Sequence, residues 1–160
     1  ECRTDAVEQP TTDPHLGRRC PLMAVPPAVS DVAFLLGRVL FSVVVGYLAL
    51  GNLLDLESSV GYAQSKGVPL ASITVPLGSL GLIAGAVAVL VGLYPAVGVL
   101  AIVAFLVPIT VIMHDFWTME GQARQNEQIH FLKNVGLIGA ALAFLALSTT
   151  AWPLAVGVGL

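Results

Sequence analysis

The stretch Val32–Leu54, VAFLLGRVLFSVVVGYLALGNLL, is a nearly unbroken run of apolar residues in which Arg38 is the one charged side chain. A helix rises about 1.5 Å per residue, so a run of this length can cross the roughly 30 Å hydrocarbon core of a bilayer. The stretch therefore predicts a transmembrane helix.

Three further apolar runs follow, at residues 72–94, 96–113 and 129–147, separated by short polar segments. The 160-residue chain is 56% hydrophobic and 11% charged, whereas soluble domains are usually about 25% charged. Short connections make consecutive spans antiparallel. The sequence predicts an all-α integral membrane protein, a four-helix up-down bundle that passes several times through the cell membrane. Its net charge of -3 excludes a basic surface for nucleic acid.

The polar residues 1–22 show no apolar periodicity, and we interpret them as a disordered N-terminal tail and a candidate non-native extension. Residues 23–150 form the expected membrane domain, and 151–160 a short C-terminal tail. The two cysteines, Cys2 and Cys20, lie in the N-terminal tail, where they either pair or stay as free thiols. No Cys/His cluster suggests a metal site.

Connectivity brings polar residues together at one face of the membrane. We call the face that holds the start of the first span side A, and the opposite face side B. The first and third spans end at side B, and the fourth begins there. Seven polar or ionisable residues should therefore converge at side B, as candidates for binding a ligand or relaying protons: Asn52, Asp55, His114, Asp115, His130, Lys133 and Asn134.

Ionisable groups are costly in lipid, so they face the bundle interior or extend to the interface. We expect Lys133 to pair with Asp55 or Asp115, and the histidines to bond the asparagines. These residues also have structural interpretations. Lys133 and His130 can extend to the interface at the start of a helix, and the two aspartates can simply mark helix ends. His114 and His130 could also hold a haem iron, although no C-x-x-C-H motif supports it.

Arg38 lies about two turns into the first span from side A, too far from side B to join that cluster. It is expected to bind an anion or to serve a structural role. Asp31, Tyr94, a lipid phosphate and an anionic ligand are its candidate partners.

Glycines follow one face of the second span. Four of them fall within about 60° of one another on a helix, and small residues on one stripe let helices approach closely in lipid. We expect packing within the bundle rather than a homodimer seam from these residues: Gly78, Gly81, Gly85 and Gly92.

The sequence also carries a set of motifs in a fixed order: LLGRVLFSVVVGYLALGNLLD, GYAQSKGVP, HDFW and HFLKNVGLIGAALAFL. In this order and spacing the chain resembles the DoxX family of small four-span membrane proteins over residues 32–147. The acidic loop residues are similar to those of members from salt-loving archaea. Many members have an acidic residue early in span two, where this chain has Ser79.

The resemblance implies a four-span fold and a link to membrane redox systems, because the family takes its name from a membrane subunit associated with quinol oxidation. Our first hypothesis is an accessory subunit of a redox complex, with a quinone headgroup as the candidate ligand at side B. The alternative is a non-catalytic assembly or interaction partner. Transport ranks last, since four short spans without a repeat leave little room for alternating access. An independent catalyst is not favoured, since no nucleophile–base pair or phosphate loop is present.

Overall fold

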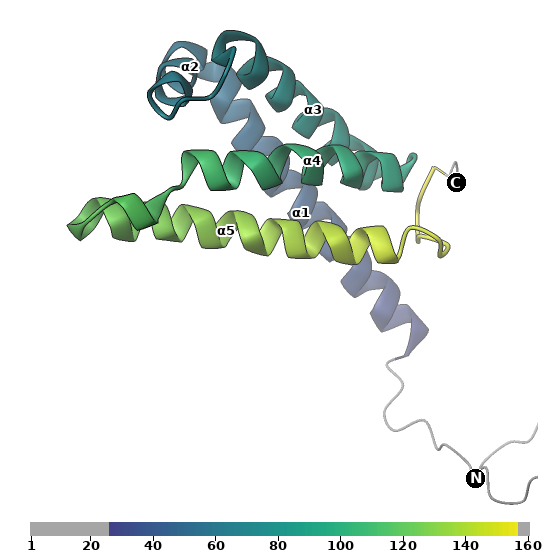
Figure 1. Ribbon diagram of the computed structural model, residues 1–160. Coiled ribbons are helices and arrows are strands. Elements are labelled where there is room, and N and C mark those ends of the chain that lie inside the picture. The colour runs from purple at the N-terminus through teal and green to yellow at the C-terminus, as the bar shows by residue number, and fades with distance from the viewer. Residues whose placement is uncertain (1–25, 157–160) are drawn as a thin grey trace, which may run out of the picture.

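The computed structural model describes residues 26–156, and all regular secondary structure within them is helical (Figure 1). Four helices are long and apolar enough to cross a membrane: α1, α3, α4 and α5. The predicted all-α membrane bundle is confirmed. In chain order the elements are α1 (Pro27–Leu54), α2 (Leu56–Ser65), α3 (Ala71–Val91), α4 (Pro95–Met113), the 3₁₀ helix η1 (Phe116–Thr118) and α5 (Gly121–Ala146).

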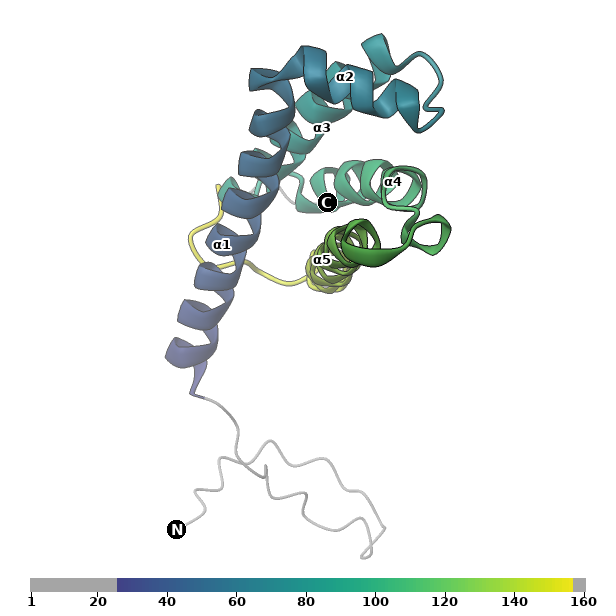
Figure 2. The same ribbon diagram turned by 90° about the vertical axis from the view of Figure 1, so that its left-hand side faces the viewer.

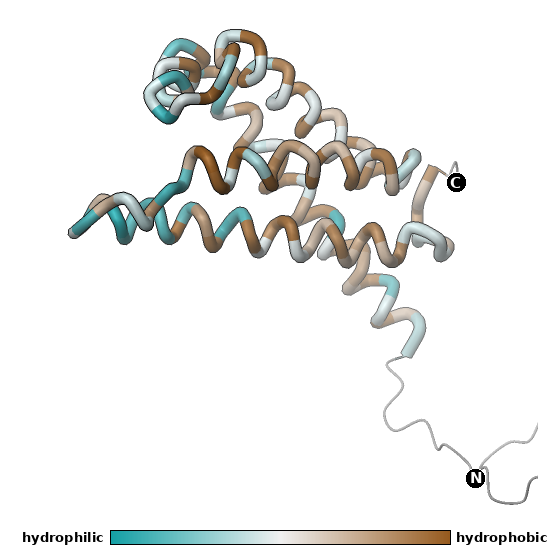
Figure 3. Tube along the Cα trace, viewed as in Figure 1, coloured by the Kyte–Doolittle hydropathy of each residue, from teal (hydrophilic) through white to brown (hydrophobic). Residues whose placement is uncertain are grey.

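The long helices form two antiparallel pairs that cross each other. α1 and α3 make one pair, α4 and α5 make the other, and α3 packs against α4 to join them (Figures 1 and 2). The end of α1, all of α2 and the start of α5 lie toward side B. Hydrophilic residues concentrate at α2 and at the start of α5, whereas the middle of the long helices is mostly apolar (Figure 3).

The predicted helix boundaries need three corrections. The first helix begins at Pro27 rather than residue 32, because a proline at the first helical position needs no N–H partner and has its φ already set. The segment 55–71, one of the polar segments between the predicted spans, was expected to be a loop but contains α2. The fourth long helix begins at Gly121 rather than residue 129, because the polar residues before the apolar run are themselves good helix formers.

The helix α2 is stable at this position because one of its faces packs on the bundle and the other faces outward. Ala63 is fully buried and packs with Ala71 and Val75 of α3, while most other α2 side chains are exposed. Glu57 lies in the first turn, where a carboxylate favours the helix dipole. The chain then turns at Gly67, whose φ of 76° suits glycine. As a result, α2 lies across the side B end of the bundle.

The central core lies where α1, α3, α4 and α5 meet. Val45, Ala49, Val89, Val99 and Ile102 are almost completely buried there. Phe41 and Phe144, in contact at 5.2 Å between ring centroids, bring α5 into this core.

Two of the four predicted packing glycines lie directly against α4. A Cβ added to Gly85 would come 2.7 Å from the carbonyl oxygen of Gly98, and one added to Gly78 would strike the Phe105 ring. Gly92 instead ends α3 with a φ of 70°. The expectation does not hold for Gly81, since a Cβ there would meet nothing within 4 Å. The α3–α4 seam is thus a Gly85–Gly98 contact, not a G-x-x-x-G surface.

Candidate functional site

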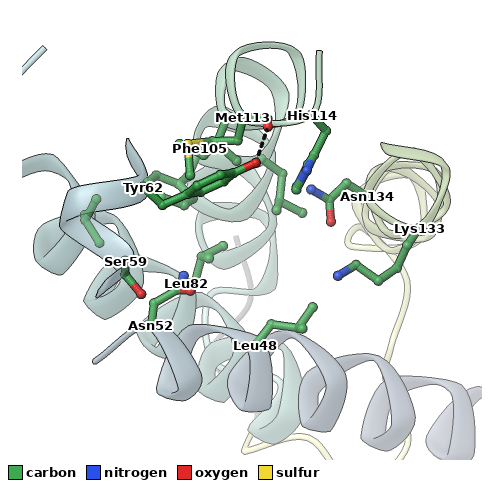
Figure 4. Close-up of a pocket in the computed structure, with 13 residues that line it drawn as sticks. Leu48, Asn52, Ser59, Tyr62, Leu82, Phe105, Met113, His114, Lys133 and Asn134 are labelled. Carbon is green, nitrogen blue, oxygen red and sulfur yellow. Dashed lines mark hydrogen bonds between the residues drawn. The ribbon is translucent and has the colours of Figure 1, made fainter. Parts of the chain in front are cut away.

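A pocket of about 280 Å³ lies near the side B ends of the long helices, and we call it the side B pocket (Figure 4). Most of its wall is apolar, with Leu48, Leu82 and Phe105 among the lining residues. Its polar lining comes from α1, α2, the end of α4 and α5: Asn52, Ser59, Tyr62, His114, Lys133 and Asn134.

Four of the seven residues predicted to converge line this pocket: Asn52, His114, Lys133 and Asn134. Asn52 lies near the end of α1, and His114 directly follows α4. Asn134 is only 6% exposed, and the neighbouring Lys133 extends from α5 toward the space beside Leu48 (Figure 4). Among residues 26–156, no carboxylate forms an ion pair with Lys133.

The other three predicted residues lie outside the pocket. Asp55 is exposed between α1 and α2. Asp115 follows His114 in the chain but bonds Lys66 and Thr118. His130 is exposed, and its ring stacks on that of His114 with 5.5 Å between centroids.

The predicted pairing of Lys133 with Asp55 or Asp115 is wrong. Asp115 forms its ion pair with Lys66 instead. Lys66 comes close because α2 folds back over the end of the bundle, and this helix is not predicted from the sequence.

The predicted bonds from the histidines to the asparagines are also wrong for His114. Its Nδ1 lies 2.7 Å from Oε2 of Glu127. Glu127 was missed because α5 was expected to start at residue 129. Had the helix been extended, Glu127 would have appeared one turn before His130 and two turns before Asn134, on the same face.

A haem between His114 and His130 does not fit this geometry. The two rings are nearly parallel, at 20°, and lie face to face. Axial ligands instead point their ring nitrogens at an iron between them.

Tyr62 connects α2 to the rest of side B. Its hydroxyl donates to Oε1 of Glu127 at 2.9 Å and lies 3.3 Å from the carbonyl oxygen of Met113. Burial raises the pKa of Tyr62 to about 12, and the hydrogen bond to Glu127 adds to the shift. Together with the Lys66–Asp115 ion pair, these contacts hold α2 over the pocket.

Tyr62→Phe should loosen α2 without unfolding the bundle. A hydrogen bond to a carboxylate contributes about 1.5–3 kcal/mol, and the lower end applies to Tyr62, which is 39% exposed, so the α2 amides should exchange hydrogen roughly ten-fold faster in lipid nanodiscs. Tyr47→Phe is the matched control, because Tyr47 is 75% exposed. Equal exchange in both variants would show that Tyr62 does not hold α2.

The stabilisation of α2 by the Tyr62 hydroxyl should be lost at alkaline pH. The raised pKa means that the folded protein holds the phenol proton more tightly than the unfolded chain. The stabilisation should be complete below pH 10, the ordinary pKa of tyrosine, and be lost as pH rises toward about 12. The protection of the α2 amides, which is their exchange rate relative to the intrinsic base-catalysed rate at each pH, tests this, and Tyr62→Phe should abolish the loss of protection between pH 10 and 12.

Arg38 lies near side A and is 2% exposed. Its Nη1 donates to the carbonyl oxygen of Pro153 at 3.1 Å, and its guanidinium lies 5.6 Å from the Trp152 ring centre. The expected partners Asp31 and Tyr94 make no bond with it in the part of the chain described here. The reason is that the segment after α5 folds back into the bundle.

That returning segment is fixed by two further hydrogen bonds. Trp152 Nε1 donates to the carbonyl oxygen of Leu147 at 2.8 Å, and the Val156 amide donates to that of Val91 at 3.0 Å. The Trp152 ring also packs on Phe34 and Phe144. The predicted N-terminal tail, with Cys2 and Cys20, lies outside the described residues.

Comparison with known proteins bears on this architecture. The DoxX family model matches residues 33–115, more than half of the chain. The chain belongs to the DoxX family. The matched region ends at Asp115, so Lys133 and Asn134 lie beyond it.

One relative of this DoxX-family protein is the inner membrane protein YphA of Escherichia coli (strain K12). The two are 24% identical over 123 residues, which cover 77% of this chain and 86% of YphA. No solved structure matches the chain. The family and the four apolar helices make this a multi-pass membrane protein whose long helices contact lipid.

Proposed function

We propose that this DoxX-family protein binds a quinone headgroup in the side B pocket, as an accessory subunit of a membrane redox complex. The observation that carries the proposal is the position of Lys133. Its side chain lines an otherwise mostly apolar pocket that Asn52 and Asn134 also line, with no carboxylate paired to it among the described residues.

The pocket offers the chemistry that a quinone needs. Quinone oxygens accept hydrogen bonds, and the ammonium of Lys133 and the amides of Asn52 and Asn134 can donate them. A charged donor makes the strongest of these bonds. The apolar wall, including Leu82 and Phe105, suits the ring face.

The proposal includes a proton route from the pocket toward side B, supported by the hydrogen bonds of His114. Reduction of a quinone to a quinol consumes two electrons and two protons, and in this proposal the redox partner supplies the electrons. His114 lines the pocket and bonds Glu127, which also accepts from Tyr62. The histidine ring has two nitrogens, one of which can donate a proton while the other accepts one, so His114 with Glu127 can deliver protons to the pocket.

The proposal predicts that Lys133→Met loses quinone affinity. A hydrogen bond from a charged group contributes about 1.5–3 kcal/mol, which corresponds to roughly 10- to 100-fold in Kd. Binding of a long-chain quinone to the protein in nanodiscs measures the effect. Lys133→Arg should keep part of the affinity, because it retains the charge.

Arg124→Gln is the matched control, since it removes a positive charge from the exposed start of the same helix. It should bind quinone as the unchanged protein does. The proposal is wrong if quinone binds no better to the protein than to empty nanodiscs, or if Lys133→Met binds equally well. A partner captured in native membranes without any quinone binding would favour a non-catalytic assembly role.

A further inference from the structure

The contact between α1 and α5 is confined to one part of these helices. Phe144 of α5 packs on Phe34 and Phe41 of α1, with ring centroids 5.6 and 5.2 Å apart. From this aromatic contact the two helices diverge toward side B, as both ribbon views show (Figures 1 and 2). The aromatic cluster of Phe34, Phe41 and Phe144 is therefore the place where α1 and α5 pack against each other.

The same helix faces continue from this contact to the side B pocket. Leu48 lies seven residues after Phe41 on α1, and Lys133 lies eleven residues before Phe144 on α5, so each shares a face with its phenylalanine. Both line the pocket, and Lys133 is also exposed. In Figure 4 the side chain of Lys133 extends from α5 toward α1, near Leu48. At pocket level, side chains rather than packed backbones separate the interior from the surroundings.

Two other sides of the pocket are covered. At the side B surface, where α2 lies, the Tyr62 hydroxyl of α2 donates a hydrogen bond to Glu127 of α5. Between α3 and α4, the Phe105 ring lies so close over Gly78 that even an added Cβ would not fit. Among the described residues, the side between α1 and α5 has no such contact at the level of the pocket, because the two helices diverge there.

We propose that the side B pocket opens sideways into the bilayer between α1 and α5, and that its ligand enters there from the lipid. This inference rests on the proposed function, because it concerns the molecule whose headgroup Lys133 holds. The ligand is lipid-soluble, with its polar head in the pocket and its apolar tail lying outward past Leu48. Exposed Val44 on α1 and Leu132 on α5 leave apolar surface for such a tail.

Photolabelling in nanodiscs tests the opening on the unchanged protein. One long-chain quinone carries a diazirine on the ring, and a second carries it in the first isoprene unit of the tail. A phospholipid with a diazirine in its acyl chain gives the background from surrounding lipid. Mass spectrometry should find the ring probe on pocket residues of α4 and α5. It should find the tail probe on residues 43–51 and 132–140, several-fold above background.

A variant that fills the opening provides the second measurement. Leu48→Trp should remove the tail labelling of α1 and α5 and slow quinone binding from the bilayer. Leu40→Trp is the matched control, because Leu40 is on the same helix and 65% exposed. In this variant the tail probe should label α1 and α5, and quinone should bind, as in the unchanged protein. Equal labelling and binding rates in the two variants would overturn the lateral entry.

The outcomes separate this inference from the proposed function. If the ring probe labels the pocket but the tail probe labels α2 or α3, the lateral opening is wrong and quinone binding stands. If the phospholipid probe labels the pocket and both α1 and α5 as strongly as quinone does, the opening is supported and the quinone proposal is wrong. If no probe labels the pocket above background, both are wrong.

Discussion

Gly85→Ala is expected to destabilise the protein by about 2–3 kcal/mol, the upper part of the range for overpacking a well-packed interior. The new Cβ would lie 2.7 Å from the carbonyl oxygen of Gly98 and 2.7 Å from Cγ1 of Ile102. The first of these atoms belongs to the backbone, so α4 itself would have to move away. Gly98→Ala should have a similar effect, because its Cβ would lie 2.7 Å from that of Ala88.

The matched control is Gly81→Ala, one helical turn away on the same helix. Its Cβ meets nothing within 4 Å, so this change should be neutral or stabilise α3 by up to about 1 kcal/mol. Unfolding in mixed micelles of increasing SDS content, followed by circular dichroism, measures both variants. If the two alanines have the same effect, α3 and α4 do not pack as closely as the structure shows.

These two glycines also show what sequence can and cannot predict here. The number and order of the long helices follow from apolar runs, because hydrocarbon thickness fixes their length. The glycine stripe follows from helical periodicity. Which member of the stripe touches a neighbour depends on the crossing of α3 and α4, and one sequence contains no direct signal for that.

The candidate site was predictable to a similar extent. Connectivity alone brought Asn52, His114 and Lys133 to one face, because it requires only that consecutive spans be antiparallel. Tyr62 and Glu127 were missed since they lie in segments that hydropathy marks as loops. In the structure these polar segments are helical. Because they are helical, the side chains of Tyr62 and Glu127 reach the residues of the pocket.

Arg38 shows the same limit at side A. Its depth in an apolar helix indicated a specific partner, and burial confirms that it is enclosed. Its partners Trp152 and Pro153 come from a segment interpreted as a tail. A backbone carbonyl carries no sequence signature as a hydrogen-bond acceptor, so this contact could not be predicted from residue types.

Arg38→Met is expected to release the segment after α5 and to lower stability by about 2 kcal/mol, the value of a hydrogen bond from a charged group. Methionine keeps part of the apolar stem but removes the donor to Pro153 and the cation beside Trp152. The Val156 amide should then exchange hydrogen faster, because its bond to Val91 depends on the segment staying in place. Trp152 emission should shift to longer wavelength, measured in a Trp117→Phe background so that one tryptophan reports.

Arg124→Met provides the control, since Arg124 is exposed near the start of α5 and the same replacement there should change neither signal. Arg38→Lys separates charge from geometry. Lysine keeps the cation but lacks the planar fork that can donate to a carbonyl while stacking on an indole. It should therefore release the segment in part. Unchanged Val156 exchange and Trp152 emission in Arg38→Met would mean that the segment is held by the Trp152 contacts with Phe34 and Phe144 alone, and that the buried guanidinium has another role.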